Sequence, residues 1–151
     1  MTHQPGPERL SDDDLSAMLT AARFGVLATV RRSGHPHLAS MIFHWDPEEW
    51  LVRFTTRSGR SKVGHLRRDP RATLHVQGPD VMSYAVAQGR GEVSSPTTAP
   101  GDAIGRELLL VAGDLVPPEE TEDFLRLQVA EERVVLRLHV ERLYGARLPP
   151  A

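Results

Sequence analysis

Apolar residues recur at every second position through the middle of this chain, and this period of two restricts the fold to one built from β-strands. Three such segments follow one another with short turns between them: Phe24 to Arg32, 36–45 and Trp50 to Thr56. The turns are Ser33-Gly34, which is typical of a tight hairpin, and Asp46-Pro47. Strands joined by connections this short run antiparallel, so the sequence predicts a meander.

The rest of the chain adds strands and helices to this meander. Further strands are predicted over 71–77, 81–94 and 133–143, and helices over 11–23, 60–69, 99–112 and 119–129. The last two helices lie in a proline-containing excursion over about 95–128. Six strands at hairpin spacing with a few helices predict an α+β protein whose strands form an antiparallel barrel. We expect a single domain over 11–147 behind a disordered tail at 1–10.

The strand predicted over 81–94 carries small residues along one face. They are Ser83, Ala85, Ala87, Gly89 and Gly91. Such a face marks a sharp bend of a barrel strand or the close approach of another surface.

Charge and composition exclude several classes of function. The net charge of −2 argues against a general nucleic-acid-binding protein. No apolar run approaches the roughly 18 residues of a membrane span, the N-terminus lacks a secretory signal, and the chain has no cysteine. We therefore expect a cytoplasmic protein that acts on a small molecule and uses no thiol chemistry and no membrane.

The most informative stretch lies between the third strand and the helix predicted after it. Residues 53–71 hold seven basic side chains against Asp69 alone, and one of the seven is Lys62, the only lysine of the chain. Four hydroxyl side chains accompany them, from Thr55, Thr56, Ser58 and Ser61. Gly59 between them allows the backbone to approach a ligand closely.

The start of this helix carries Arg60 and Lys62, where a cation opposes the positive end of the helix dipole by about 0.3–1 kcal/mol. A bound phosphate removes the conflict, because it accepts hydrogen bonds from both side chains and from the free amide groups of the first turn. The sequence therefore indicates a phosphate site. The alternative is a solvated basic loop without a ligand, and the glycine spacing of a P-loop is absent.

The order of motifs in this region resembles that of a known family. The segments are the strand GHPHLASMIF, the strand WLVRFTT, the loop RSGRSK, the helix VGHLRRDPRA and the later strand VAQGRGEV. This order is similar to that of the pyridoxamine 5′-phosphate oxidase-like split-barrel superfamily, and within it to the flavin/deazaflavin oxidoreductases that bind coenzyme F420. The resemblance covers roughly 12–94 and the last strand.

The resemblance implies a six-stranded split barrel that forms a homodimer, with a phosphorylated flavin or deazaflavin in each cleft between the subunits. It implies F420 as the cofactor, with FMN as the alternative, and hydride transfer to a small electron-poor organic acceptor. The phosphate would be held by Thr55, Thr56, Arg60 and Lys62, with Ser61 beside them, and the ring system would lie along Ala39, Ser40, Met41 and Ile42. Because the cofactor carries the electrons, we expect no catalytic side chain.

Other functions stay open at this point. One is a non-catalytic carrier or sensor of the same cofactor, and another is a split barrel that handles haem. A metal site is not predicted, because His35 and His37 share one face of their strand whereas His44 falls on the other. The pair Gly89 and Gly91 lacks the third glycine of a dinucleotide-binding fingerprint.

Overall fold

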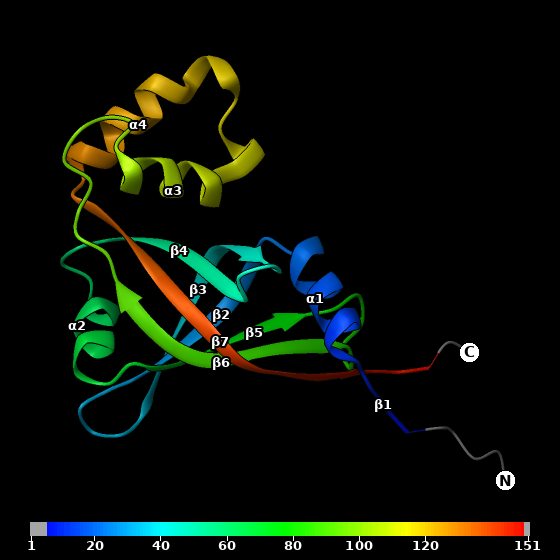
Figure 1. Cartoon of the computed structure of the whole chain (residues 1–151). Coiled ribbons are helices and arrows are strands. Elements are labelled where there is room, and N and C mark those ends of the chain that lie inside the picture. The colour runs from blue at the N-terminus through cyan, green and yellow to red at the C-terminus, as the bar shows by residue number, and fades with distance from the viewer. Residues whose placement is uncertain (1–5, 150–151) are drawn as a thin grey trace, which may run out of the picture.

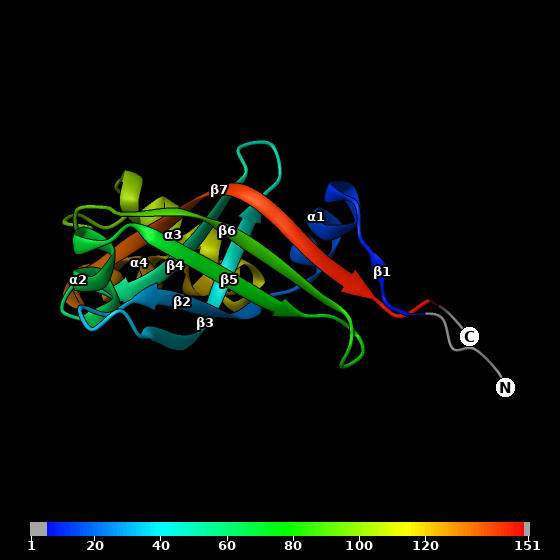
Figure 2. The same cartoon turned by 90° about the horizontal axis from the view of Figure 1, so that it is seen from below.

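The centre of the protein is a closed barrel of six antiparallel strands, seen in a computed structural model that describes residues 6–149 (Figures 1 and 2). The strands are β2 (Phe24–Val30), β3 (Pro36–Asp46), β4 (Leu51–Arg57), β5 (Arg71–Gln77), β6 (Tyr84–Val93) and β7 (Arg133–Arg147). Around the barrel they run in the order β7-β4-β3-β2-β5-β6, and β6 pairs with β7 to close the ring. The predicted α+β fold with a six-stranded antiparallel barrel is confirmed.

Four α-helices pack around this barrel: α1 (Asp12–Ala21), α2 (Ser61–Arg68), α3 (Ala103–Ala112) and α4 (Thr121–Ala130). Helices α1 and α2 lie at opposite ends of the barrel, and α3 lies against β3, β4 and β7 with α4 packed on it (Figure 1). Two short 3-10 helices, η1 (Gly113–Leu115) and η2 (Pro118–Glu120), connect α3 to α4. Within residues 6–149, none of the helices has the length and apolar character that crossing a membrane requires.

The apolar core fills the barrel and continues under the two end helices. Its largest fully buried side chains from the strands are Leu27, Phe54, Leu74, Leu136 and Leu138. Leu15 and Leu19 of α1 close one end, and Val63 and Leu66 of α2 close the other. Burying a side chain of this size contributes about 1.5–3 kcal/mol, so alternate residues of every strand are committed to the core. The residues between them are left to form an outer surface.

The N-terminal segment pairs with the far end of β7. Strand β1 (Glu8–Arg9) lies antiparallel to it, with Glu8 opposite Arg147. The predicted disorder of 1–10 is therefore wrong for these two residues, and positions 1–5 lie outside the described residues. The reason is that β7 continues beyond its predicted end at 143 and offers the tail a free backbone edge.

Side-chain caps shift two other boundaries from the predicted ones. Strand β6 begins at Tyr84 rather than 81, because the Asp80 carboxylate accepts hydrogen bonds from the Met82 N–H and the Ser83 hydroxyl and holds a turn. Helix α3 begins at Ala103 rather than 99, because the Asp102 carboxylate accepts the Gly105 N–H at 2.7 Å.

The small-residue face of β6 allows a close approach, as the sequence predicts, and a β-bulge of the β6–β7 ladder lies beside it. Opposite the step from Gln88 to Gly89, β7 carries one extra residue, Glu141. A Cβ atom on Gly89 would overlap the backbone carbonyl of His139, and one on Gly91 would lie 2.7 Å from Leu66 of α2. Both glycines therefore let neighbouring parts of the barrel come close.

We expect the Gly89→Ala variant to be less stable than the parent protein by about 2 kcal/mol or more, because β7 must move to admit the methyl group. The matched control is Gly64→Ala in α2, where a Cβ atom meets nothing within 4 Å. There alanine should raise the free energy of unfolding by about 0.5–1 kcal/mol through helix propensity. Urea denaturation measures both. Equal stability of Gly89→Ala and the parent protein would contradict the tight β6–β7 approach.

Candidate functional site

The barrel opens where β3 and β4 separate. These strands pair only over residues 43–46 of β3 and 51–54 of β4. Beyond that point β3 continues along β2, whereas β4 continues along β7. Ile42 and Thr55 are therefore the first residues on the two sides of the opening, so the strand that carries 39–42 borders it.

The four β3 residues predicted to line the ring system alternate between two faces. Ala39 and Met41 point into the barrel, where Met41 is buried in the core. Ser40 and Ile42 point to the outer face. A ligand on the outside of this strand would therefore contact two of the four side chains.

The backbone of the same stretch offers hydrogen-bonding groups at the opening. Phe43 donates its N–H to the Arg23 carbonyl, which makes the odd-numbered residues of β3 the ones that bond to β2. In an antiparallel ladder, the alternate residues direct their N–H and C=O groups to the other side. The amide groups of Ser40 and Ile42 therefore face the side that β4 has left. This placement suits the backbone contacts that the resemblance implies.

Lys62 and Thr56 meet at the start of α2. The Lys62 Nζ lies 3.5 Å from the Thr56 Oγ1, the long limit of a hydrogen bond, and Thr56 is buried. Burial, together with the positive charges of Arg60 and Arg133, lowers the pKa of Lys62 below its ordinary value. Within residues 6–149, this ammonium forms no ion pair with a carboxylate. An anion beside it would stabilise its charged form.

The arginines around Lys62 divide into paired and unpaired ones. Arg57 and Arg133 both bind the Glu131 carboxylate, at 2.5 and 3.1 Å. Arg60 is the N-cap residue of α2, is exposed, and has no carboxylate partner in the described part of the chain. Two positive charges, on Arg60 and Lys62, are therefore left uncompensated in this loop.

The two adjacent threonines point in opposite directions. Thr56 points into the barrel towards Lys62, whereas Thr55 points outward, where an Arg133 Nη1 lies 3.5 Å from its Oγ1. Ser61 begins α2 and is exposed. The structure thus brings Thr56 and Lys62 together, keeps Arg60 and Ser61 next to them in the chain, and directs Thr55 to the other face of β4.

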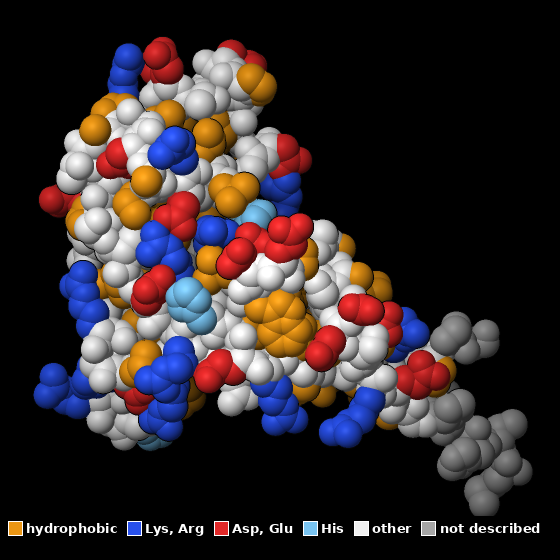
Figure 3. Space-filling view, in the orientation of Figure 1, with side chains coloured by type: hydrophobic (Ala, Val, Ile, Leu, Met, Phe, Trp, Pro, Cys, Tyr) orange, Lys and Arg blue, Asp and Glu red, His pale blue; other side chains and the backbone are white. Residues whose placement is uncertain are grey.

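This end of the molecule has the chemistry of a phosphate site. Arg60 makes no capping hydrogen bond with its side chain, so the first amide groups of α2 remain available to an acceptor. Lys and Arg side chains gather around the end of the barrel that α2 covers (Figure 3). Charge-assisted hydrogen bonds from Arg60 and Lys62 would add to those of the amides. The residues present therefore fit a phosphorylated ligand.

A pair of histidines next to Lys62 is missing from the sequence-based site. The His65 Nδ1 lies 3.0 Å from the hydroxyl of the buried Thr29, and the His65 and His37 rings are 5.2 Å apart. Burial, followed by the nearby His37 and the positive Arg68, lowers the pKa of His65. The sequence signal that could have identified His65 is its position three residues after Lys62, on the same side of α2.

No metal cluster accompanies these histidines. Within residues 6–149, no three His, Asp or Glu side chains lie close enough together to hold a metal ion. The His37 Nδ1 is buried and has no hydrogen-bond partner in the described part of the chain. A buried polar atom without a partner is stabilised when a ligand forms a hydrogen bond with it.

Comparisons with known proteins agree with this geometry. A family model described as pyridoxamine 5′-phosphate oxidase matches residues 11–146. A Mycobacterium tuberculosis (strain CDC 1551 / Oshkosh) protein named F420H(2)-dependent biliverdin reductase is 30% identical over 139 residues, which are 91% of this chain and 89% of that protein.

Two solved structures extend the comparison to three dimensions. The conserved hypothetical protein Rv2991 from Mycobacterium tuberculosis has a TM-score of 0.73 at 21% identity, over 96% of this chain and 90% of that one. A structure named F420 Reductase has a TM-score of 0.62 at 25% identity, over 85% of this chain and 94% of that one. The first of these is a likeness of fold alone.

We expect the Lys62 amine to titrate below the ordinary lysine value of about 10.4, because burial and Arg60 disfavour its charge. As the pH rises through this lowered pKa, Lys62 loses its charge and the affinity for inorganic phosphate should fall. Since Lys62 is the only lysine, NMR of lysine-labelled protein reports it as a single signal. Arg60→Gln should raise the pKa, and the exposed Arg106→Gln should not. A titration midpoint at or above the ordinary value would contradict this description.

Proposed function

Because the chain belongs to the pyridoxamine 5′-phosphate oxidase family, we propose that it is an oxidoreductase that binds a phosphorylated flavin or deazaflavin and passes hydride to a small electron-poor organic acceptor. The observation that carries this proposal is the uncompensated charge of Arg60 and Lys62 beside the opening between β3 and β4. If the cofactor phosphate is held there, the ring system attached to it lies next to residues 39–42 of β3.

In this proposal, different residues bind the phosphate and the ring system of the cofactor. Lys62 and Arg60 hold the phosphate, with the Thr56 hydroxyl and the first amide groups of α2. The backbone groups of Ser40 and Ile42 bind polar edges of the ring system. A flavin or deazaflavin supplies the hydride chemistry when it is bound, so the protein has to bind it, orient it and exclude water.

F420 is the cofactor that we propose first, with FMN second. The relative at 30% identity is named for an F420H(2)-dependent reaction, and the structure at 25% identity is named F420 Reductase. Further exposed arginines lie past the phosphate loop, with Arg67 and Arg68 in the last turn of α2 and Arg31 and Arg32 in the β2–β3 turn that Arg68 contacts through the Val30 carbonyl. They favour a cofactor with negative charges beyond a single phosphate, which F420 has in its polyglutamate tail and FMN lacks.

We expect purified protein to bind F420 or FMN with a Kd below about 100 μM, which corresponds to about 5.5 kcal/mol. The Arg60→Gln, Lys62→Gln double variant should bind the same cofactor at least about 100-fold more weakly, because charge-assisted hydrogen bonds contribute about 1.5–3 kcal/mol each. Arg106→Gln, which removes an exposed arginine from α3, is the matched control. Unchanged affinity in the double variant would place the phosphate elsewhere.

Turnover decides between an enzyme and a carrier or sensor of the same cofactor. Reduced cofactor is mixed with the protein and a panel of activated alkenes, quinones and tetrapyrroles, the last because of the biliverdin reductase relative. Oxidation of the cofactor at the expense of an acceptor supports the enzyme. Tight binding without turnover for the whole panel would favour the carrier, and a Soret band on adding haem would favour a haem protein.

A homodimer that completes the cofactor site is part of this proposal. The outer face of β2 and β3 is apolar although it faces solvent: Phe24 is 63% and Leu38 is 64% exposed. Their neighbours across the ladder, Ile42 and Ala28, extend the patch over both strands. A patch of large exposed apolar side chains on a sheet marks an interaction surface, and this one includes part of the strand that carries 39–42.

We expect Leu38→Glu to convert the dimer to monomers and to weaken cofactor binding with it, because a carboxylate cannot be buried in this patch without a partner. Leu127→Glu on α4, where the side chain is 52% exposed, is the control and should leave both properties unchanged. Sedimentation velocity gives the oligomeric state and a cofactor titration gives the affinity. A dimeric Leu38→Glu variant would contradict the interface assigned here.

A further inference from the structure

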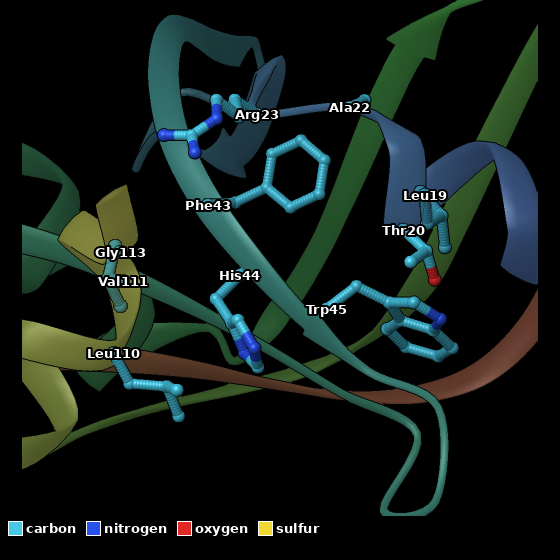
Figure 4. Close-up of a pocket in the computed structure, with 10 residues that line it drawn as sticks. All are labelled: Leu19, Thr20, Ala22, Arg23, Phe43, His44, Trp45, Leu110, Val111 and Gly113. Atoms are coloured by element: carbon cyan, nitrogen blue, oxygen red, sulfur yellow. The ribbon is translucent and has the colours of Figure 1, made fainter. Parts of the chain in front are cut away.

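A small pocket lies in the corner between α1, β3 and α3 (Figure 4). Its volume is about 190 Å³. Apolar side chains line most of it, among them Leu19 from α1, Trp45 from β3 and Leu110 from α3. Arg23 forms part of the rim, where it binds the carboxylate of Asp114 in η1. The helical excursion after β6 thus supplies one wall of a cavity that the barrel alone would leave open.

His44 is a polar group in this pocket without a partner. Its Nδ1 is buried and has no hydrogen bond, and its Nε2 forms none within residues 6–149. Burial, reinforced by the positive charge of Arg53, lowers the pKa of His44, while Asp46 opposes the shift. The imidazole is therefore neutral near pH 7 and keeps one N–H to donate and one nitrogen to accept.

A row of ionic contacts holds the surroundings of His44 in place. His44 stands beside Arg53 of β4, which stands beside Arg137 of β7. The Glu107 carboxylate of α3 accepts hydrogen bonds from both arginines, at 2.9 Å from the Arg53 Nε and 2.5 Å from an Arg137 Nη. This clamp fixes α3 against the sheet, and with it the pocket wall that carries Leu110.

The pocket adjoins the stretch of β3 assigned to the cofactor ring. His44 lies on the outer face of β3, the same face as Ser40 and Ile42. Two residues along a strand span about 6.6–6.8 Å. His44 therefore lies beyond Ile42 by a distance similar to the width of one aromatic ring. A molecule that enters the pocket from this face would lie next to a ring system bound along 39–42.

We infer that this pocket, with His44 as its hydrogen-bonding residue, binds the acceptor as a single conjugated ring that carries a carbonyl or similar polar group. The inference rests on the proposed function, because the acceptor is the second substrate of that reaction. His44 is a positioning residue here. The reduced cofactor provides the hydride and its electron pair to the acceptor carbon, and the solvent provides the proton.

The volume limits the class of acceptor. Cavities of about 150 Å³ accommodate a benzene ring, whereas drug-sized ligands occupy about 300–1,000 Å³. At about 190 Å³ the pocket accepts one substituted ring. A monocyclic quinone fits whole, but a linear tetrapyrrole could place only one of its four rings inside. We therefore expect single-ring acceptors to have lower KM values than tetrapyrroles.

Benzamide tests the pocket without a cofactor, since it is a single ring with a carbonyl and an N–H group and is redox-inert. Calorimetry or ligand-observed NMR of the cofactor-free protein should show binding. Leu110→Trp, which fills the pocket from a partly exposed position, and His44→Leu should each weaken binding at least about tenfold, the equivalent of one hydrogen bond. Leu127→Trp on α4 is the matched control. Equal benzamide affinity in Leu110→Trp and the parent protein would overturn the assignment.

Kinetics with a monocyclic quinone extend the test to the loaded protein. Leu110→Trp and His44→Leu should raise the KM for the quinone about tenfold or more and leave the cofactor Kd unchanged. His44→Gln, which keeps a hydrogen-bonding group, should restore part of the KM. An altered cofactor Kd with an unchanged quinone KM would refute the acceptor pocket. Failure of the parent protein to bind either cofactor would instead refute the proposed function, whatever the benzamide result.

Discussion

The pairing of β6 with β7 closes the barrel, and the placement of every other element follows from it. Strand β7 pairs with β4 on one side and with β6 on the other. Closure requires the backbones to come close, and in the β6–β7 pair a Cβ atom on Gly89 or on Gly145 would overlap the backbone of the facing strand. A barrel closed in this way has no free edge among its six strands except where neighbours diverge.

That divergence locates the polar site. Strand β4 stays paired with β7, and β3 stays paired with β2. Strands β3 and β4 therefore separate beyond the pair Phe43 and Phe54. Within residues 6–149, the gap in their ladder leaves backbone groups of β3 without a partner strand, and helix α2 begins close to the gap with a lysine that forms no ion pair. Hydrogen-bonding groups that a regular barrel would use internally are thus available to a ligand, close to the charges of Arg60 and Lys62, which form no ion pair within residues 6–149.

The sequence predicted the parts of this protein that depend on local patterns. Strand patterns and turn signals predicted all six barrel strands, and the small residues of β6 predicted the close approach of a neighbouring surface that occurs at Gly89. Local patterns do not encode contacts between distant segments. The pairing of β1 with the end of β7 is of this kind, and so are the contact of His65 with Thr29 and the binding of Glu107 to Arg53 and Arg137. The sequence likewise grouped Thr55 with Thr56, although the alternation of a strand directs neighbouring side chains to opposite faces.

The two halves of the proposed reaction depend on different parts of the chain. Cofactor binding depends on the β4–α2 loop and on β3, which belong to the barrel, whereas the acceptor pocket depends on a wall from α3. That wall is attached to the barrel by Glu107, whose carboxylate stays charged because the hydrogen bonds from Arg137 and Arg53 lower its pKa against the effect of burial. Changes in α3 that keep Glu107 can therefore reshape the pocket while the cofactor site keeps its geometry. If the proposed reaction is correct, the barrel determines which cofactor is used, and the excursion between β6 and β7 determines which acceptor meets it.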